Sequence, residues 1–401
     1  MDDVDKAPPR SGVGPPFACI ALLLQGGGAL GAYQGGVYQG LAEAKLHPDW
    51  VAGISIGAVN AAIIAGNPPE ARVDKLRAFW EQITDSSLSG WWNGLVPQFA
   101  KDASARGALN QVNAMATVAT GVPGFFSPRL PPPWFQSPGS PAATSYYDTS
   151  PLKKTLEQLV DFDRINAKSV RLSAGAVNIR TGNFVYFDNT TQKLRPEHIL
   201  ASGALPPGLP AVEIDGEHYW DGGLVSNTPL QWVLEYGPRQ DTLAFQVDLW
   251  SAIGKLPRNM TDVATRQKEI TFSSRTRENT DQFKKAQHIR HAVAKMLAEL
   301  SDDVRKSPKT KALRAFADDK VYNIAHLIYR SRSYEHDSKD YEFSRLSMEE
   351  HWKAGYEDTL ETLRHPEIFR RPGGADGIAT FDFNTRTRAK VPTEGNRHEA
   401  K

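Results

Sequence analysis

One short stretch, residues 51–58, restricts the fold of this chain more than any other part of the sequence. It reads Val-Ala-Gly-Ile-Ser-Ile-Gly-Ala, which predicts the end of a buried strand, a sharp turn at Ser55 and the start of a helix over residues 58–65. Gly53 and Gly57 stand two positions before and after Ser55, the Gly-x-Ser-x-Gly pattern of a nucleophile elbow. A serine at such a turn needs a strained backbone, and side chains at the flanking positions would collide with the strand and the helix. The helix would aim its positive N-terminus at an oxyanion formed when Ser55 attacks a carbonyl group.

A glycine-rich turn precedes the elbow. Residues 17–24 form a continuous apolar run, as expected for a central parallel strand that is buried on both faces. The run ends in a turn with four glycines, which are Gly26, Gly27, Gly28 and Gly31. A helical stretch through residue 45 follows.

Two interpretations of this turn compete. The spacing Gly26-x-Gly28-x-x-Gly31 fits the dinucleotide-binding fingerprint, which needs an acidic residue at the end of the next strand. The nearest candidate, Asp49, comes before that strand and therefore at its wrong end. In the other interpretation, the backbone N–H groups of the glycines form an oxyanion hole. Neighbouring parallel strands would then bring the turn next to Ser55.

A third motif lies near residue 221. Asp221 is followed by Gly222 and Gly223, in a loop between a strand and a helix over residues 229–236. Taken alone, an aspartate beside two glycines predicts no more than a turn. The run at 201–210, Ala-Ser-Gly-Ala-Leu-Pro-Pro-Gly-Leu-Pro, precedes this loop and is too rich in Gly and Pro for regular structure.

Four motifs therefore occur in one order: Gly-Gly-Gly-x-x-Gly at 26–31, Gly-x-Ser-x-Gly at 53–57, Ala-Ser-x-Ala-x-Pro at 201–206 and Asp-Gly-Gly at 221–223. Over about residues 17–235 the chain resembles the patatin-like phospholipases, and four motifs in order are far more specific than one.

The resemblance implies a three-layer α/β/α fold with a mainly parallel central sheet, and a serine acyl hydrolase with a Ser–Asp dyad. It implies Ser55 as the nucleophile, Asp221 as the general base and the N–H groups of Gly26, Gly27 and Gly28 as the oxyanion hole. The glycines that support these motifs are Gly31, Gly53, Gly57, Gly222 and Gly223. Leu30 departs from the family pattern, because many relatives have Arg or Lys there. The apolar Leu30 side chain offers no charge for contact with a lipid headgroup.

The sequence also predicts how the chain is divided. We expect a disordered tail at 1–16, a hydrolase core at 17–235, a mostly helical α/β extension packed on the core at 236–371, and a largely disordered tail at 372–401. Residues 86–149 form a long insertion rich in aromatic residues and proline, read either as a packed cap or as a lid that meets lipid. Ser347-Met348-Glu349-Glu350 fits a capping box and predicts the start of a late helix.

Composition excludes several classes of protein. A net charge of +1 argues against a dedicated nucleic-acid binder. One cysteine, Cys19, excludes an internal disulfide and fits a reducing compartment. The polar N-terminus is unlike a secretory signal, and the eight-residue apolar run 17–24 is too short to span a bilayer. We expect a cytoplasmic protein with transient peripheral contact to membranes, and the oligomeric state stays open.

The expected activity is hydrolysis of carboxylic esters of lipids through an acyl-serine, of the phospholipase A, lysophospholipase or esterase type, without metal or cofactor. A first alternative is a Ser-Asp-His triad in which His288, His291 or His326 serves as the base. A second alternative is a catalytically silent protein that binds lipid or acts as a scaffold.

Overall fold

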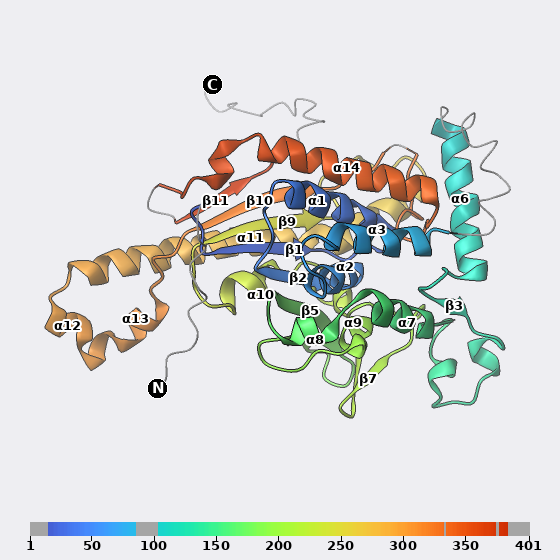
Figure 1. Cartoon of the computed structure of the whole chain (residues 1–401), viewed down its shortest axis with the longest axis horizontal. Coiled ribbons are helices and arrows are strands. Elements are labelled where there is room, and N and C mark those ends of the chain that lie inside the picture. The colour runs from blue at the N-terminus through green and yellow to red at the C-terminus, as the bar shows by residue number, and fades with distance from the viewer. Residues whose placement is uncertain (1–14, 86–102, 333, 374–376, 384–401) are drawn as a thin grey trace, which may run out of the picture.

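A nine-stranded sheet runs through the molecule, in the computed structural model, which describes residues 15–85, 103–332, 334–373 and 377–383 (Figure 1). From one edge to the other, its strands are β11 (Ile378–Phe381), β10 (Tyr322–Ile328), β9 (Thr242–Asp248), β1 (Cys19–Leu24), β2 (Trp50–Ile54), β5 (Arg171–Asn178), β8 (Glu217–Asp221) and β7 (Val212–Ile214), and β6 (Phe184–Asp188) also pairs with β5. The six strands from β11 to β5 are parallel, and β6, β7 and β8 are antiparallel to their neighbours.

Helices cover both faces of the sheet. In the described residues they are α1 (Ala32–Glu43), α2 (Ile56–Ala65), α3 (Arg72–Ile83), α6 (Ala103–Thr120), α7 (Ser150–Leu159), α8 (Phe162–Asn166), α9 (Pro196–Ser202), α10 (Leu230–Glu235), α11 (Met260–Glu299), α12 (Asp302–Lys306), α13 (Lys311–Phe316) and α14 (Arg345–Leu363). The predicted three-layer α/β/α fold with a mainly parallel sheet is therefore confirmed. Over the described residues, no helix has the length and apolar character needed to cross a membrane.

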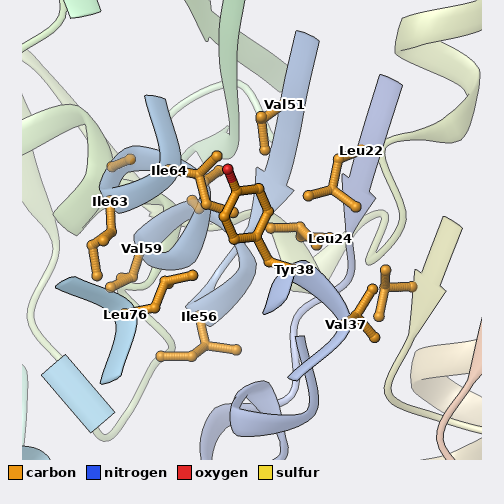
Figure 2. Packing of buried hydrophobic residues seen from close by; sticks show 14 of the residues in the cluster. Leu22, Leu24, Val37, Tyr38, Val51, Ile56, Val59, Ile63, Ile64 and Leu76 are labelled. Atoms are coloured by element: carbon orange, nitrogen blue, oxygen red, sulfur yellow. The ribbon is translucent and has the colours of Figure 1, made fainter. Parts of the chain in front are cut away.

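The alternation of side chains along β1 explains the two cores. Leu22 and Leu24 point to one face, where they pack with Val51 of β2 and with residues of α1, α2 and α3 (Figure 2). Ala21 and Leu23 point to the other face, toward α10 and α11. The continuous apolar run in the sequence is thus a strand that is buried on both faces.

Helices α1 and α14 approach each other so closely that glycine is required at the contact. A Cβ atom at Gly36 would lie 1.8 Å from the carbonyl oxygen of Trp352. The start of α14 differs from the prediction. Its N-cap is Ser344, whose hydroxyl accepts a hydrogen bond from the Ser347 N–H, so the helix begins at Arg345. Ser347, which was predicted to be the N-cap, is instead the residue whose N–H group Ser344 caps.

The C-terminal part supplies half of the parallel strands. β9 pairs with β1 along its whole length, and β10 and β11 extend the sheet beyond it. The division at residue 235 therefore runs through one continuous sheet. Four residues of the expected C-terminal tail, Ile378–Phe381, form the edge strand β11. Of the expected tails at 1–16 and 372–401, residues 1–14, 374–376 and 384–401 lie outside the described residues.

The predicted insertion is described from residue 103 onward, and 86–102 lie outside the described residues. It consists of α6, the short strands β3 (Ser127–Pro128) and β4 (Tyr147–Asp148), and two single-turn 3₁₀ helices, Pro133–Phe135 and Pro141–Ala143. Figure 1 shows this insertion at one end of the molecule and α12 and α13 at the other.

Candidate active site

Ser55 lies between β2 and α2 with φ 57° and ψ −128°, a backbone conformation that residues other than glycine rarely adopt. Backbone strain of this kind persists only where the surroundings enforce it. A Cβ atom at Gly53 would lie 2.2 Å from the carbonyl oxygen of Gly57, and one at Gly57 would lie 2.3 Å from the carbonyl oxygen of Leu24. Since only glycine fits at both positions, the strained turn predicted from the sequence is present. Ser55 is partly exposed at its tip.

Ser202 stabilises the turn at Ser55 through two hydrogen bonds. Its hydroxyl accepts a hydrogen bond of 3.1 Å from the Ser55 N–H and donates one of 2.6 Å to the carbonyl oxygen of Gly175 in β5. Ser202 is fully buried at the end of α9. Through Ser202, the run at 201–206 therefore connects the serine turn to β5, the neighbouring strand in the sheet. The sequence did not predict this role.

The register of the sheet brings Asp221 to Ser55. Ile54, the last residue of β2, lies beside Gly175 of β5. β8 enters the sheet antiparallel to β5, and its last residue, Asp221, lies opposite Ala176. Because Gly175 and Ala176 are neighbours, the ends of β2 and β8 meet at one point of the sheet. A Cβ atom at Gly222 would lie 2.6 Å from the carbonyl oxygen of Gly175, so the loop after β8 needs glycine there.

The carboxylate of Asp221 is buried, with 1% of the residue exposed. Burial raises its pKa to about 7, and hydrogen bonds from the Gly223 N–H and from the Ser55 side chain act in the lowering direction. The bond from Gly223 is 2.7 Å long. A carboxylate with a pKa near neutrality holds a proton far better than an ordinary aspartate, which suits it to accept one from a hydroxyl group.

The glycine turn after β1 lies against the serine. In the parallel pairing of β1 with β2, Leu24 lies beside Gly53, so the two turns leave the sheet side by side. A Cβ atom at Gly26 would lie 2.9 Å from the Cβ atom of Ser55. The glycine turn and the serine turn are therefore neighbours, as the sequence predicted.

Within the part of the chain that the structure describes, the N–H groups of residues 26–28 make no hydrogen bond, whereas those of the next two residues do. The Ala29 N–H donates to the carbonyl oxygen of Asp340, and the Leu30 N–H donates to that of Gly27. Gly27 and Gly28 are partly exposed. The N–H groups of Gly27 and Gly28 are therefore without a hydrogen-bond partner among the described residues.

Two side chains hold the Gly26 carbonyl group. Its oxygen accepts hydrogen bonds from Nδ2 of Asn227 at 3.0 Å and from Nε1 of Trp250 at 2.9 Å. In a trans peptide the carbonyl group and the following N–H point in opposite directions. Fixing the Gly26 carbonyl therefore fixes the direction of the Gly27 N–H. Neither donor was predicted from the sequence. Only Asn227 has a local signal, because it closes the stretch that begins with the Asp-Gly-Gly motif.

Gln25 anchors the start of the same turn. Its Oε1 accepts hydrogen bonds from the backbone N–H groups of Leu249 and Trp250, at 2.6 and 3.0 Å. Its Nε2 donates to Oγ1 of Thr228 and to the carbonyl oxygen of Phe272, both at 3.1 Å. Gln25 is fully buried, so one side chain links the glycine turn to three separate segments.

A cavity of about 330 Å³ opens beside Ser55 and contains the glycine turn and Asp221 in its wall. Most of the wall is apolar, with contributions from Phe125, Phe126, Tyr147, Leu205, Leu209 and Phe343. Three of these residues come from the insertion and one from the C-terminal part. The only acid on the described wall besides Asp221 is Asp340, which forms an ion pair of 2.8 Å with Lys268. The cavity can hold a hydrocarbon chain next to the serine.

The histidines proposed for a triad lie elsewhere. His326 lies on β10, and its Nδ1 is 3.8 Å from Oδ2 of Asp248. His288 and His291 lie on α11. Among the described residues, no histidine lines the cavity beside Ser55.

The other residues considered from the sequence have structural positions. Asp49 lies at the opposite end of β1 from the glycine turn, where its Oδ2 accepts a hydrogen bond of 2.8 Å from the Ile20 N–H. Leu30 is fully buried in the core, and Cys19 is buried in β1. A Cβ atom at Gly31 would lie 2.7 Å from the Ile56 side chain, so this glycine permits close packing of α1 and α2. In the described ranges, no cluster of three or more His, Cys, Asp or Glu side chains could hold a metal ion.

Comparisons with known proteins found two family models and several solved structures that are similar to this chain. A family model described as patatin-like phospholipase matches residues 22–234, and a second, described as patatin phospholipase, matches residues 270–374. The crystal structure of VipD from Legionella pneumophila is similar at 14% identity and a TM-score of 0.38, over 91% of this chain and 72% of VipD. The type III effector protein ExoU is similar at 13% identity and a TM-score of 0.30, over 88% of this chain and 53% of ExoU. The comparison with curated proteins found no match.

Proposed function

The chain belongs to the patatin-like phospholipase family, whose model matches more than half of its 401 residues, and we propose that it hydrolyses carboxylic esters of lipids through an acyl-enzyme formed on Ser55. Asp221 acts as the general base, and the N–H groups of Gly26, Gly27 and Gly28 form the oxyanion hole. One observation carries this proposal. The strained, partly exposed Ser55 shares a cavity wall with the buried carboxylate of Asp221, whose pKa burial raises to about 7.

The reaction follows from these positions. The Ser55 Oγ attacks the ester carbonyl carbon while its proton passes to the Asp221 carboxylate. The carbonyl oxygen becomes an oxyanion beside the glycine turn, whose N–H groups and the N-terminus of α2 stabilise the negative charge. The tetrahedral intermediate then collapses, the ester C–O bond breaks, and the leaving alkoxide takes the proton from Asp221. An acyl group remains bound to Ser55 Oγ.

Water completes the cycle. Asp221, ionised again, takes a proton from a water molecule as its oxygen attacks the acyl carbonyl carbon. The second intermediate expels Ser55 Oγ, which recovers its proton from Asp221, and the fatty acid leaves. Every proton moves between Asp221 and an oxygen atom, so these steps need no histidine. The apolar cavity wall supports an acyl chain as the part of the substrate held beside Ser55.

Covalent labelling tests the proposal without knowledge of the substrate. A fluorophosphonate probe reacts only with an activated serine, and we expect mass spectrometry of the digested protein to locate the adduct on Ser55. Absence of an adduct on the folded protein would favour the alternative of a silent lipid-binding protein. Loss of labelling on replacement of His326, at unchanged stability, would favour a triad.

A further inference from the structure

The described part of the insertion carries almost no charge. Between residues 103 and 149 the only charged residues are Arg106, Arg129 and Asp148, although about eleven would be expected from the 23% charged residues of the whole chain. Arg106 is buried and forms an ion pair of 3.2 Å with Glu350. Arg129 donates a hydrogen bond from Nε to Ser145 Oγ. The surface of this segment is therefore nearly neutral, and its one acidic group, Asp148, lies at the C-terminal end of the segment.

Large apolar side chains protrude from this neutral surface. Leu130 is 87% exposed, Trp134 68%, Phe135 74% and Tyr146 45%. We call these four residues the apolar tip. Clustered exposure of this kind is unfavourable in water and marks a surface that contacts a partner or a membrane.

The apolar tip is joined to the wall of the substrate cavity. The ring of Trp134 packs edge-on against that of Tyr146, with 6.1 Å between centroids. The Tyr146 N–H donates a hydrogen bond of 3.1 Å to the carbonyl oxygen of Pro207, which lines the cavity. Tyr147, the next residue, also lines it. A surface that covered the tip would therefore lie next to the cavity that contains Ser55.

We propose that the apolar tip inserts into the interface of a lipid bilayer and places the cavity at the membrane surface. This inference rests on the proposed function, because a lipid ester resides in such a surface. Trp, Tyr, Phe and Leu are the side chains that favour the boundary between headgroups and acyl chains. The lack of charge on the tip makes the attachment apolar. Binding therefore requires no anionic lipid and withstands salt, which screens only electrostatic attraction.

Vesicle flotation tests the proposal independently of turnover. The full chain with Ser55→Ala, which leaves the lipid intact, is mixed with phosphatidylcholine vesicles at low salt and at high salt. We expect the protein to float with the vesicles equally under both conditions. No binding to phosphatidylcholine would overturn the proposal. Binding that needs anionic lipid and disappears in high salt would also overturn it, because it would indicate an electrostatic site elsewhere.

Matched variants locate the surface. Trp134→Ser with Phe135→Ser should lower the vesicle affinity by an order of magnitude or more, since two large apolar side chains no longer leave water. The control, Leu313→Ser with Phe316→Ser, changes exposed apolar residues of α13 at the other end of the molecule and should bind like the parent (Figure 1). Equal affinity of the tip variant and the parent, with both folded, would contradict the proposal.

Two further readouts separate the remaining explanations. A protein that carries Trp134→Ser and Phe135→Ser but retains Ser55 should hydrolyse a soluble short-chain ester at the parental rate. Trp134 and Phe135 do not line the cavity. Absence of ester turnover in the parent would remove the proposed function and leave the flotation result standing. Light scattering that showed a dimer dissociated by the tip substitutions, without vesicle binding, would assign the tip to a second copy of the chain and overturn the proposal.

Discussion

The indole N–H of Trp250 donates a hydrogen bond of 2.9 Å to the carbonyl oxygen of Gly26. Trp250 follows β9 and Gly26 follows β1, and these two strands are neighbours in the sheet. The bond reaches the glycine turn from the side opposite to the Gly27 N–H, because the two ends of a trans peptide point in opposite directions. Trp250 therefore orients an N–H group of the proposed oxyanion hole.

Trp250→Phe should lower kcat about tenfold and change KM little, since it removes one hydrogen bond that orients a donor used mainly in the transition state. The measurement is steady-state hydrolysis of a p-nitrophenyl ester. Affinity for a boronic acid that mimics the tetrahedral intermediate should fall by a similar factor.

Trp232→Phe is the matched control for this variant. The indole N–H of Trp232 donates a comparable hydrogen bond of 3.1 Å to Ser173 Oγ, away from the cavity wall. This variant should keep the parental kcat. Equal losses in the two variants would show that the effect of Trp250 is structural and would remove its positioning role.

The pH dependence of kcat/KM should follow the ionisation of Asp221. The base must be ionised to accept the Ser55 proton, and the pKa of Asp221 is about 7. The rate should therefore rise with pH, reach half of its maximum near pH 7 and stay level above it. A soluble ester measured across this range tests the expectation. A rate that is independent of pH on both sides of neutrality would exclude Asp221 as the base.

Much of this site could be predicted from local sequence, and some of it could not. Side chains at Gly53 and Gly57 would collide with backbone atoms that lie only a few residues away in the chain or on the neighbouring strand. The strained turn can therefore be predicted from a short sequence pattern. The Asp-Gly-Gly motif is readable for the same reason. Trp250 and Asn227 act through pairings between distant segments, and nothing in their immediate sequence marks the Gly26 carbonyl group as their partner.

Element boundaries show the same limit. A capping box predicted α14 to start at Ser347, but Ser344 also offers a hydroxyl group and is the serine that caps the helix. β11 was missed, since Ile378–Phe381 lies in a polar segment and becomes a strand only by pairing with β10. Residues that depend on a tertiary partner give no periodic signal.

Asp221→Asn should stabilise the protein at alkaline pH. Burial raises the pKa of Asp221 above its unfolded value of 3.8, so the folded state loses stability as the pH rises from about 4 through about 7. The amide removes this loss. The melting temperature of the variant relative to the parent should therefore increase from about pH 4 to about pH 8. A difference in melting temperature that is constant over this range would contradict the assigned burial of a charged carboxylate.

Gly27→Ala separates the oxyanion interpretation from the dinucleotide interpretation. The added Cβ would lie 2.8 Å from Leu249 Cδ1 and 3.2 Å from Trp250 Nε1, so either the turn or these two side chains must shift. The loss of one oxyanion donor lowers kcat by about 10²–10³. We expect a loss of this size on a p-nitrophenyl ester, with KM changed much less.

A control and a titration complete this experiment. A Cβ atom at Gly373 would meet nothing within 4 Å, so Gly373→Ala should retain full activity. Calorimetric titration of the parent with NAD, NADP and FAD should show no binding. Micromolar binding of one of them, together with an unimpaired Gly27→Ala esterase, would reverse the assignment of the turn.

The central claim is that Ser55 forms the acyl-enzyme, and ester turnover by Ser55→Ala tests it most directly. The variant removes only the hydroxyl group, so its melting temperature should stay close to that of the parent. Its kcat/KM on a p-nitrophenyl ester, measured beside the parent at pH 8, should fall to the background of the uncatalysed reaction. Hydrolysis by the folded variant at a rate near that of the parent would contradict the account.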